Sequence, residues 1–315
     1  MYYLLGYARL DRLSVVTGVP GLNRGDAYDV PVLLPPPSEQ RRIAAILDRA
    51  DTLRRKRVAV DALAERILPA LFVAMIGDPF TNSGGWAIQP LEEITSVIHR
   101  YPTFYGVDYV ASGVPVVRIS DIQPNGWLDR RLEHYVRVPT NFSEQFPLTV
   151  LDAYDIVMAV RGDTTGKLGL VPPELAGANI SPNLIRLGPK TGKSTPLFLF
   201  TCLSLLQRST KMLINDTAKK SITAQNIKAI QIPAPSYERQ IRFDKTAQDV
   251  MGVLDRQACC RNRLDSLFSS LVDQAFTGSL TAKWREDHMT EVLADMAEQA
   301  RLLGSITTTD QFAPA

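Results

Sequence analysis

Two long stretches of the chain repeat apolar side chains at alternating intervals of three and four residues. The first stretch has this spacing at Ile43, Ile46, Ala50, Leu53, Arg57, Val60, Ala64, Ile67 and Leu71. The second has it at Phe243, Ala247, Val250, Leu254, Gln257, Arg261, Leu264, Phe268 and Leu271. This period is typical of a narrow coiled-coil stripe, in which a polar residue can fix the pairing register. The pattern predicts two long helices that form a coiled coil, against the alternative of two ordinary surface helices.

The two stretches also open alike, which indicates an internal repeat. An apolar segment, a proline-rich stop and a glutamate precede each helix, with prolines at 35–37 and at 233 and 235. Proline is not tolerated in a helix interior, so these residues mark helix starts near Glu39 and Glu238. We expect one continuous helix over 39–75 and a second copy of the arrangement about 200 residues later, too long a period for a solenoid.

The segment between the two helices, residues 80–229, has a different pattern. Short apolar and alternating runs predict strands at 114–119, 155–160 and 183–187, with turns at 162–166 and 188–192. Residues 197–212 are predicted to form one helix. The sequence therefore predicts an α+β fold, with a mixed α/β domain of about 150 residues and two long helices. A further short helix is expected at 286–303, followed by a frayed tail.

Composition narrows the class of protein without identifying it. Of the 315 residues, 45% are hydrophobic and 22% are charged, which excludes wholesale disorder. No apolar run approaches the ~20 residues that span a bilayer, and the N-terminus has no signal-peptide pattern. The three cysteines, Cys202, Cys259 and Cys260, lack the spacing of a disulfide framework. These features predict a cytoplasmic protein that neither enters a membrane nor contains structural disulfides.

No motif for catalysis, a cofactor or a metal is found. The glycine-rich segments at 162–167 and 188–194 each have three residues between their glycines, where a phosphate-binding loop has four. The three histidines are scattered, without the spacing of metal ligands. We therefore expect a protein that is not itself an enzyme and binds no cofactor or metal.

The distribution of charge is more informative than the net charge of +2. Residues 80–160 carry a net charge of −4, whereas residues 161–228 carry +7. Many of the basic residues lie in turns beside Gly, Thr, Ser and Asn, a composition that suits contacts with phosphates and base edges. The alternative is a solvated basic face without a partner.

Several segments in a fixed order resemble the specificity (S) subunit of type I restriction–modification systems. They are the two copies of the proline stop and helix, the helix end at 71–79, Trp86, and residues 91–94, 113–122, 155–157, 161–167, 179–183 and 275–284. The resemblance covers residues 1 to about 284, and it rests on the order of the segments and their duplication.

The resemblance implies a non-catalytic subunit that recognises double-stranded DNA. In this family two target recognition domains lie at opposite ends of an antiparallel coiled coil, and each reads half of a split site in the major groove. Methyltransferase (M) subunits, which bind S-adenosylmethionine, and motor-nuclease (R) subunits supply the chemistry. Within this chain we expect Lys219, Lys220, Ser221 and Thr223 to form a loop near the DNA, assisted by Arg161 and Lys167.

The predicted domains depart from the family at the N-terminus. Residues 1–38 correspond to the remnant of a first recognition domain, 39–79 to the first helical region, 80–232 to a whole recognition domain, 233–284 to the second helical region and 285–315 to a tail. One recognition domain reads one half-site, so a homodimer that reads an interrupted palindrome is one expectation. A fragment that needs a separate chain is the other, and a coiled-coil scaffold that no longer reads DNA is a further alternative.

Overall fold

The computed structural model describes residues 2–8, 23–64, 66–100, 108–123, 125–210 and 222–309. The chain divides into two compact units. One comprises Met1–Ala62 and Asp255–Ala315, and the other is the continuous segment Leu63–Leu254.

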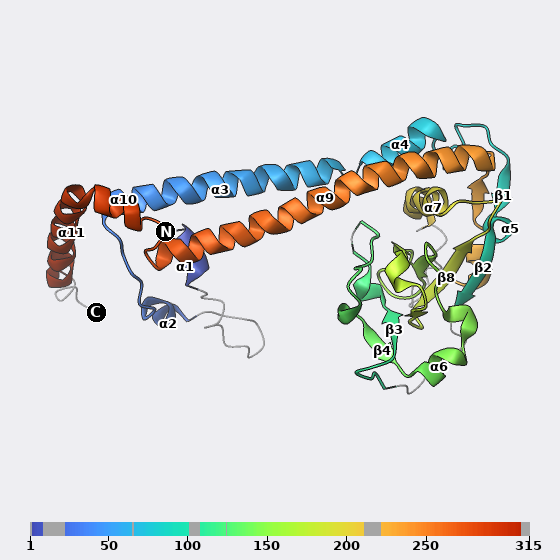
Figure 1. Ribbon diagram of the computed structural model, residues 1–315, viewed down its shortest axis with the longest axis horizontal. Helices are drawn as coiled ribbons and strands as arrows, with labels where there is room; N and C mark the ends of the chain where they lie inside the picture. Colours follow the sequence, from blue (N-terminus) through green and yellow to red (C-terminus); the bar gives the residue numbers. More distant parts are fainter. Residues whose placement is uncertain are drawn as a thin grey trace. The chain divides into compact units, whose positions relative to one another are not determined.

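The unit formed by the two ends of the chain is helical (Figure 1). Its helices are α1 (Tyr2–Tyr7), α2 (Arg24–Tyr28), most of α3 (Pro37–Ala64), the C-terminal part of α9 (Tyr237–Phe276), α10 (Ala282–Asp287) and α11 (Met289–Thr309). Helices α3 and α9 lie side by side and antiparallel, because Leu47 packs near Ala275 while Arg54 pairs with Asp265. Helix α11 extends beyond the expected end at residue 303.

Two of the N-terminal tyrosines contact the long helices. Tyr3 donates a hydrogen bond to Asp48 on α3 at 2.7 Å, and its ring lies 6.1 Å from that of Phe268 on α9. Tyr7 stacks on Phe276 at 4.8 Å. Helix α1 therefore packs against the helical pair, although Tyr2 and Leu5 remain exposed.

The predicted stripe of α3 is wrong in part of its length. The side chains that face α9 include Leu47, Arg54 and Asp61, each one residue after the predicted Ile46, Leu53 and Val60. Leu53 is 52% exposed and Val60 is 43% exposed. The sequence pattern favoured apolar residues, whereas this part of the contact is built from charged ones.

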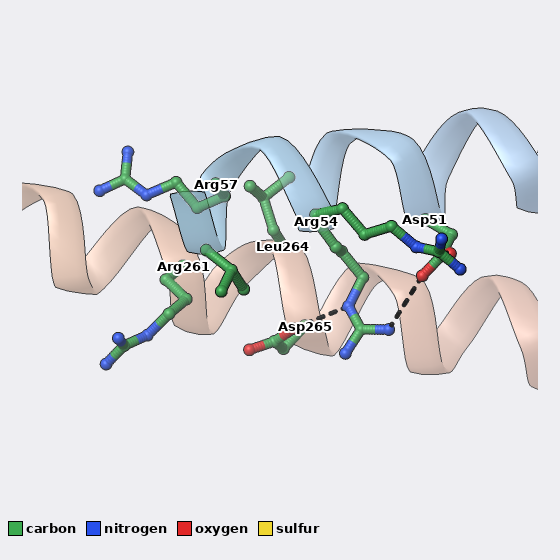
Figure 2. Close-up of a pocket in the computed structure, with 8 residues that line it drawn as sticks. Asp51, Arg54, Arg57, Arg261, Leu264 and Asp265 are labelled. Carbon is green, nitrogen blue, oxygen red and sulfur yellow. Dashed lines mark hydrogen bonds and ion pairs between the residues drawn. The ribbon is translucent and has the colours of Figure 1, made fainter. Parts of the chain in front are cut away.

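Charged side chains line a pocket in the middle of the α3–α9 contact (Figure 2). Arg54 donates through Nε to Asp265 Oδ1 at 2.9 Å, and its guanidinium lies over the Phe268 ring. Asp61 pairs with Arg57 at 3.0 Å and with Arg261 at 3.5 Å. Charges of alternating sign on the two helices therefore match in this antiparallel register.

The expected single helix over 39–75 is two helices, α3 and α4 (Ile67–Met75). Pro69 is the third residue of α4. Proline cannot donate to the carbonyl four residues earlier and its ring clashes with it, so a helix continuing through residue 65 is disfavoured. By contrast, α9 contains no proline and is continuous over 40 residues.

The unit Leu63–Leu254 contains three small sheets. Their strands are β1 (Ile88–Pro90), β2 (Thr95–Arg100), β3 (Val114–Val117), β4 (Val136–Val138), β5 (Ile156–Ala159), β6 (Leu168–Leu170), β7 (Asn179–Ile180), β8 (Leu184–Pro189) and β9 (Gln231–Pro233). The strand orders are β2-β8-β5-β6, β4-β3-β7 and β1-β9. Strands β3, β5 and β8 confirm the three strand predictions.

Helices join these sheets. They are α4, α5 (Leu91–Ile94), α6 (Thr140–Glu144), α7 (Pro196–Thr210), α8 (Ala224–Lys228) and the first part of α9, with short 3-10 helices at Ile119–Asp121, Leu132–His134, Pro147–Thr149 and Pro173–Leu175. Helix α7 confirms the helix expected at 197–212. Its Phe198 ring stacks on Phe72 of α4 at 5.6 Å, and Phe72 meets Phe243 of α9 edge-on. These rings join the helices to one hydrophobic core.

The internal repeat is visible in local structure. Asn23 caps α2 and Thr223 caps α8, and each short helix precedes a proline stop and a long helix. The copies differ in pairing, because Ile232 is buried in β9, which pairs with β1, whereas the corresponding Leu34 is 49% exposed. Both copies therefore have the capped short helix and the proline stop before the long helix, whereas the paired strand before the stop is found in the second copy.

Candidate nucleic-acid interface

Polar side chains from separate parts of the sequence meet at one end of the strands in the sheet β2-β8-β5-β6. Strand β2 ends at Arg100, which is paired with Ile185 of β8. Ala159 of β5 is paired with Leu184 of β8. Arg161 follows β5 and Asn183 precedes β8, so both lie at the same end of the sheet as Arg100. The antiparallel register thus brings two guanidinium groups and one amide together.

The two arginine side chains lie close enough for their charges to interact. In the described parts of the chain neither Arg100 nor Arg161 has an ion pair. Burial lowers the pKa of Arg100, and the positive charge of Arg161 lowers it further. Two like charges held together in this way favour an anionic ligand over open solvent.

A tight turn at 162–166 lies beside these arginines. Gly162 and Gly166 have φ values of 84° and 88°, in the left-handed region that favours glycine. Thr165 closes the turn by donating to the Gly162 carbonyl at 2.5 Å, and the Gly166 amide donates to Ala159 at 2.8 Å. The turn therefore holds a defined backbone next to Arg161.

The predicted DNA contact Lys167 is occupied within the fold. Its Nζ donates a hydrogen bond to the carbonyl of Ile122. This bond ties the segment after the glycine turn to the loop that contains Gly126 and Trp127. Lys167 is therefore positioned to connect two loops, a role that no local pattern in the sequence predicts.

Of the four residues predicted to contact DNA in the loop at 219–223, only Thr223 is described. Its hydroxyl oxygen accepts from the Asn226 amide at 3.2 Å and so caps α8, which leaves the hydroxyl proton for another acceptor. The neighbouring Ile222 amide donates to the Val160 carbonyl at 3.1 Å. The structure therefore brings Thr223 toward Arg161, while Lys219, Lys220 and Ser221 lie outside the described residues.

Three other basic residues of the stretch 161–228 do not extend this surface. Arg186 is buried and pairs with Asp155 at 2.6 Å and with Asp152 at 2.5 Å. Lys190 and Lys193 follow β8 at the opposite end of the sheet. These three cations belong to the same basic stretch of sequence as Arg161 but lie apart from it in the fold.

Sequence reasoning missed Arg100 and Asn183. Arg100 belongs to the acidic stretch 80–160, so its contribution becomes visible only when β2 is paired with β8. Asn183 ends a segment that carried the family resemblance, but its place at the end of the sheet depends on the pairing of β5 with β8. The missing signal was strand register in both cases.

The described residues offer no metal site, since no group of three or more His, Cys, Asp or Glu side chains among them could hold an ion. Within the same residues, no helix is long and apolar enough to cross a membrane.

Curated relatives are specificity subunits. The EcoBI type I specificity subunit of Escherichia coli is 24% identical over 288 residues, covering 81% of this chain and 59% of its own length. The MjaVIII specificity subunit of Methanocaldococcus jannaschii is 21% identical, with 85% and 66% covered. The chain thus spans about three fifths to two thirds of the length of these relatives.

Solved structures share the fold. A chain of a type I R-M system studied for complex assembly and conformational transition is 21% identical with a TM-score of 0.55, covering 88% of this chain and 69% of that one. A type I S subunit from M. genitalium is 15% identical with a TM-score of 0.53, covering 87% and 71%. The model of the type I restriction modification DNA specificity domain matches residues 83–255, more than half of the chain. The chain therefore belongs to the family of type I restriction modification DNA specificity domains.

Proposed function

We propose that this chain is the DNA specificity subunit of a type I restriction–modification complex and reads part of a bipartite target. The observation that carries the proposal is the pair Arg100 and Arg161, which lies without ion pairs among the described residues, beside the glycine turn and inside the family-matched segment. Such a group attracts the DNA backbone, because each phosphate neutralised by Lys or Arg releases a counterion.

The contacts divide into positioning and reading. Arg100 and Arg161 bind phosphates, which fixes the register of the protein on the duplex without reading sequence. Asn183 and Thr223 offer an amide and a hydroxyl at the same end of the sheet. Such groups recognise base edges in the major groove. Lys219, Lys220 and Ser221 remain predicted contacts.

Methyltransferase subunits dock on the helical pair. Leu53 and Val60 of α3 are exposed on a flank of the helix beside its ion pairs with α9, where a partner helix can bury them. Motor-nuclease subunits join the same assembly, and all chemistry rests with the partners. Leu53→Glu/Val60→Glu should abolish co-purification with the methyltransferase. Leu148→Glu, at an equally exposed residue of the other unit, should leave co-purification intact.

Methylation-sensitive sequencing of host DNA tests the reading function directly. Deleting the gene should remove one methylated sequence pattern, and restoring it should return the same pattern. A methylome that is unchanged by deletion, together with retained binding to the methyltransferase, would support the scaffold that does not read DNA.

Two copies of the chain supply the two half-sites, so the target is an interrupted palindrome. Light scattering of the purified protein should give the mass of a dimer, and the methylated site should have two identical halves. A monomer without methylation, or a site with two different halves, contradicts the homodimer and favours a second specificity chain.

A further inference from the structure

A buried carboxylate on α9 bonds to no group of its own helix. Asp244 Oδ1 accepts from the Thr195 hydroxyl and from the Phe198 amide, each at 2.8 Å, and Oδ2 accepts from the Leu197 amide at 3.0 Å. One turn earlier, Gln240 is 1% exposed and accepts from the Thr195 amide at 3.0 Å. All of these residues belong to the unit Leu63–Leu254.

These bonds cap the start of α7. The first amides of a helix have no partner within it, and a neighbouring Ser, Thr, Asp or Asn side chain normally accepts from one of them. Thr195 precedes α7 in the capping position, but its hydroxyl donates to Asp244 instead. The place and direction of α7 are therefore set by side chains of α9.

Helix α7 in turn supports two turns of the candidate interface. The space that a Cβ on Gly126 would occupy is taken by the Phe200 ring, which also lies 5.9 Å from the ring of Trp127. Near the other end of α7, the Gln207 side chain lies 3.7 Å from the ideal Cβ position on Gly166. The hydrogen bond from Lys167 to Ile122 links these same two turns. A displacement of α7 would thus move both.

We propose that Asp244 and Gln240 are positioning residues for DNA recognition, which act by fixing α7 beneath the turns at 125–127 and 162–166. This inference rests on the proposed function of the chain as a DNA reader. Neither residue touches DNA. Their effect is on the angle and position at which Arg161 and its turn meet the duplex, so they control discrimination between sequences rather than charge neutralisation.

The test uses the full chain in its assembled complex and Asp244→Asn, which keeps the shape but leaves one accepting oxygen instead of two. The preferred site is first selected from random duplexes, and affinities are then measured for that site and for single-base variants. Asp244→Asn should reduce the discrimination between them about tenfold, since a mismatched pair normally costs ~1–3 kcal/mol. The salt dependence should stay unchanged because the same phosphates are neutralised.

Two matched variants separate positioning from general damage. Asp249→Asn removes an exposed carboxylate from the same helix and should bind as wild type. Thr195→Val removes the hydroxyl that bonds to Asp244 and should lower discrimination, whereas Thr195→Ser keeps the hydroxyl and should restore it.

The outcomes are distinct. Wild-type discrimination in a folded Asp244→Asn complex overturns the inference, as does an equal loss of affinity for every sequence. If Asp244→Asn fails to fold by circular dichroism, the Thr195→Val and Thr195→Ser pair decides on the same criteria. If the wild-type complex itself shows no sequence preference, the proposed function fails and not the positioning role alone.

Discussion

Two arginine sites of the sheet β2-β8-β5-β6 have opposite surroundings. Arg186 lies within β8, where its side chain is 9% exposed and pairs with Asp155, whose side chain is 5% exposed. Arg100 and Arg161 lie together at one end of the sheet, without an ion pair among the described residues. The same residue type therefore belongs to the folded core at one site and is left without a counter-charge among these residues at the other.

This difference has a physical basis in desolvation. Burial raises the pKa of the Asp155 carboxyl, while the Asp152 amide and Arg186 oppose that shift by stabilising the charged form. A pair of this kind is balanced as long as both partners are present. Arg100 and Arg161 have no such partner among the described residues, and an anionic ligand lowers the energy of two like charges held together in this way. The free energy of unfolding should depend on the first group, and the affinity for DNA on the second.

Removing Arg186 should have the largest effect on stability. Arg186→Met leaves Asp155 buried without its partner, and we expect a loss of about 3–5 kcal/mol in the free energy of unfolding. Urea denaturation followed by circular dichroism measures this. Arg186→Met/Asp155→Leu removes both charges and should recover most of the loss. If Arg186→Met alone were as stable as wild type, the buried arginine would not differ from Arg100 and Arg161 in its contribution to stability.

Removing both free arginines should affect DNA binding instead. Arg100→Gln/Arg161→Gln should reduce the slope of log K against log salt by about 0.9 for each phosphate that is no longer neutralised, ~1.8 in total. Fluorescence anisotropy with the assembled complex from 50 to 300 mM salt, roughly the range over which such slopes are resolved, gives this number. Unfolding should change by no more than ~0.5 kcal/mol. An unchanged slope would place the DNA elsewhere.

Lys167 should differ both from the buried Arg186 and from the pair Arg100 and Arg161. Lys167→Met removes the hydrogen bond to Ile122 and should cost about 1 kcal/mol of stability, because a buried carbonyl loses its partner. The salt slope should remain at the wild-type value. A fall in slope of about 0.9 would instead show that Lys167 reaches a phosphate.

The smallest effect is expected from Lys190, which follows β8 at the end of the sheet opposite to Arg100 and Arg161. Lys190→Gln removes an exposed charge in the same basic stretch of sequence, yet neither the salt slope nor the free energy of unfolding should change measurably. It is therefore the matched control for Arg161. A slope that falls as much as in the Arg100→Gln/Arg161→Gln variant would show that the whole basic stretch binds DNA.

Local patterns predicted much of the fold. Strands β3, β5 and β8 and helix α7 lie where apolar runs and turn residues placed them, because these elements are specified by neighbouring residues. The single helix over 39–75 was wrong for an equally local reason, since Pro69 was given too little weight. The predicted stripe of α3 was wrong in its middle, because the charged residues Arg54 and Asp61 face α9 there while the apolar Leu53 and Val60 are exposed.

The candidate site was less accessible from sequence. Arg161 and its glycine turn were recognised, since both lie within one short segment. Arg186 counted toward the basic charge of residues 161–228 although it is buried, and Arg100 was overlooked because its stretch of sequence is acidic. Both errors arise from averaging charge along a chain, whereas strand pairing determines which charges meet.

The antiparallel contact between α3 and α9 also constrains how the protein is made. Arg54 and its partner Asp265 are 211 residues apart in sequence. A ribosome that adds about 5–20 residues per second needs roughly 10–40 s to cover that distance, so α3 emerges long before its partner exists. During this interval Tyr3 can already bond to Asp48, only 45 residues away, and cover part of the surface of α3 that later contacts α9. Helix α1 is therefore placed to act as a temporary partner during translation, before α9 arrives.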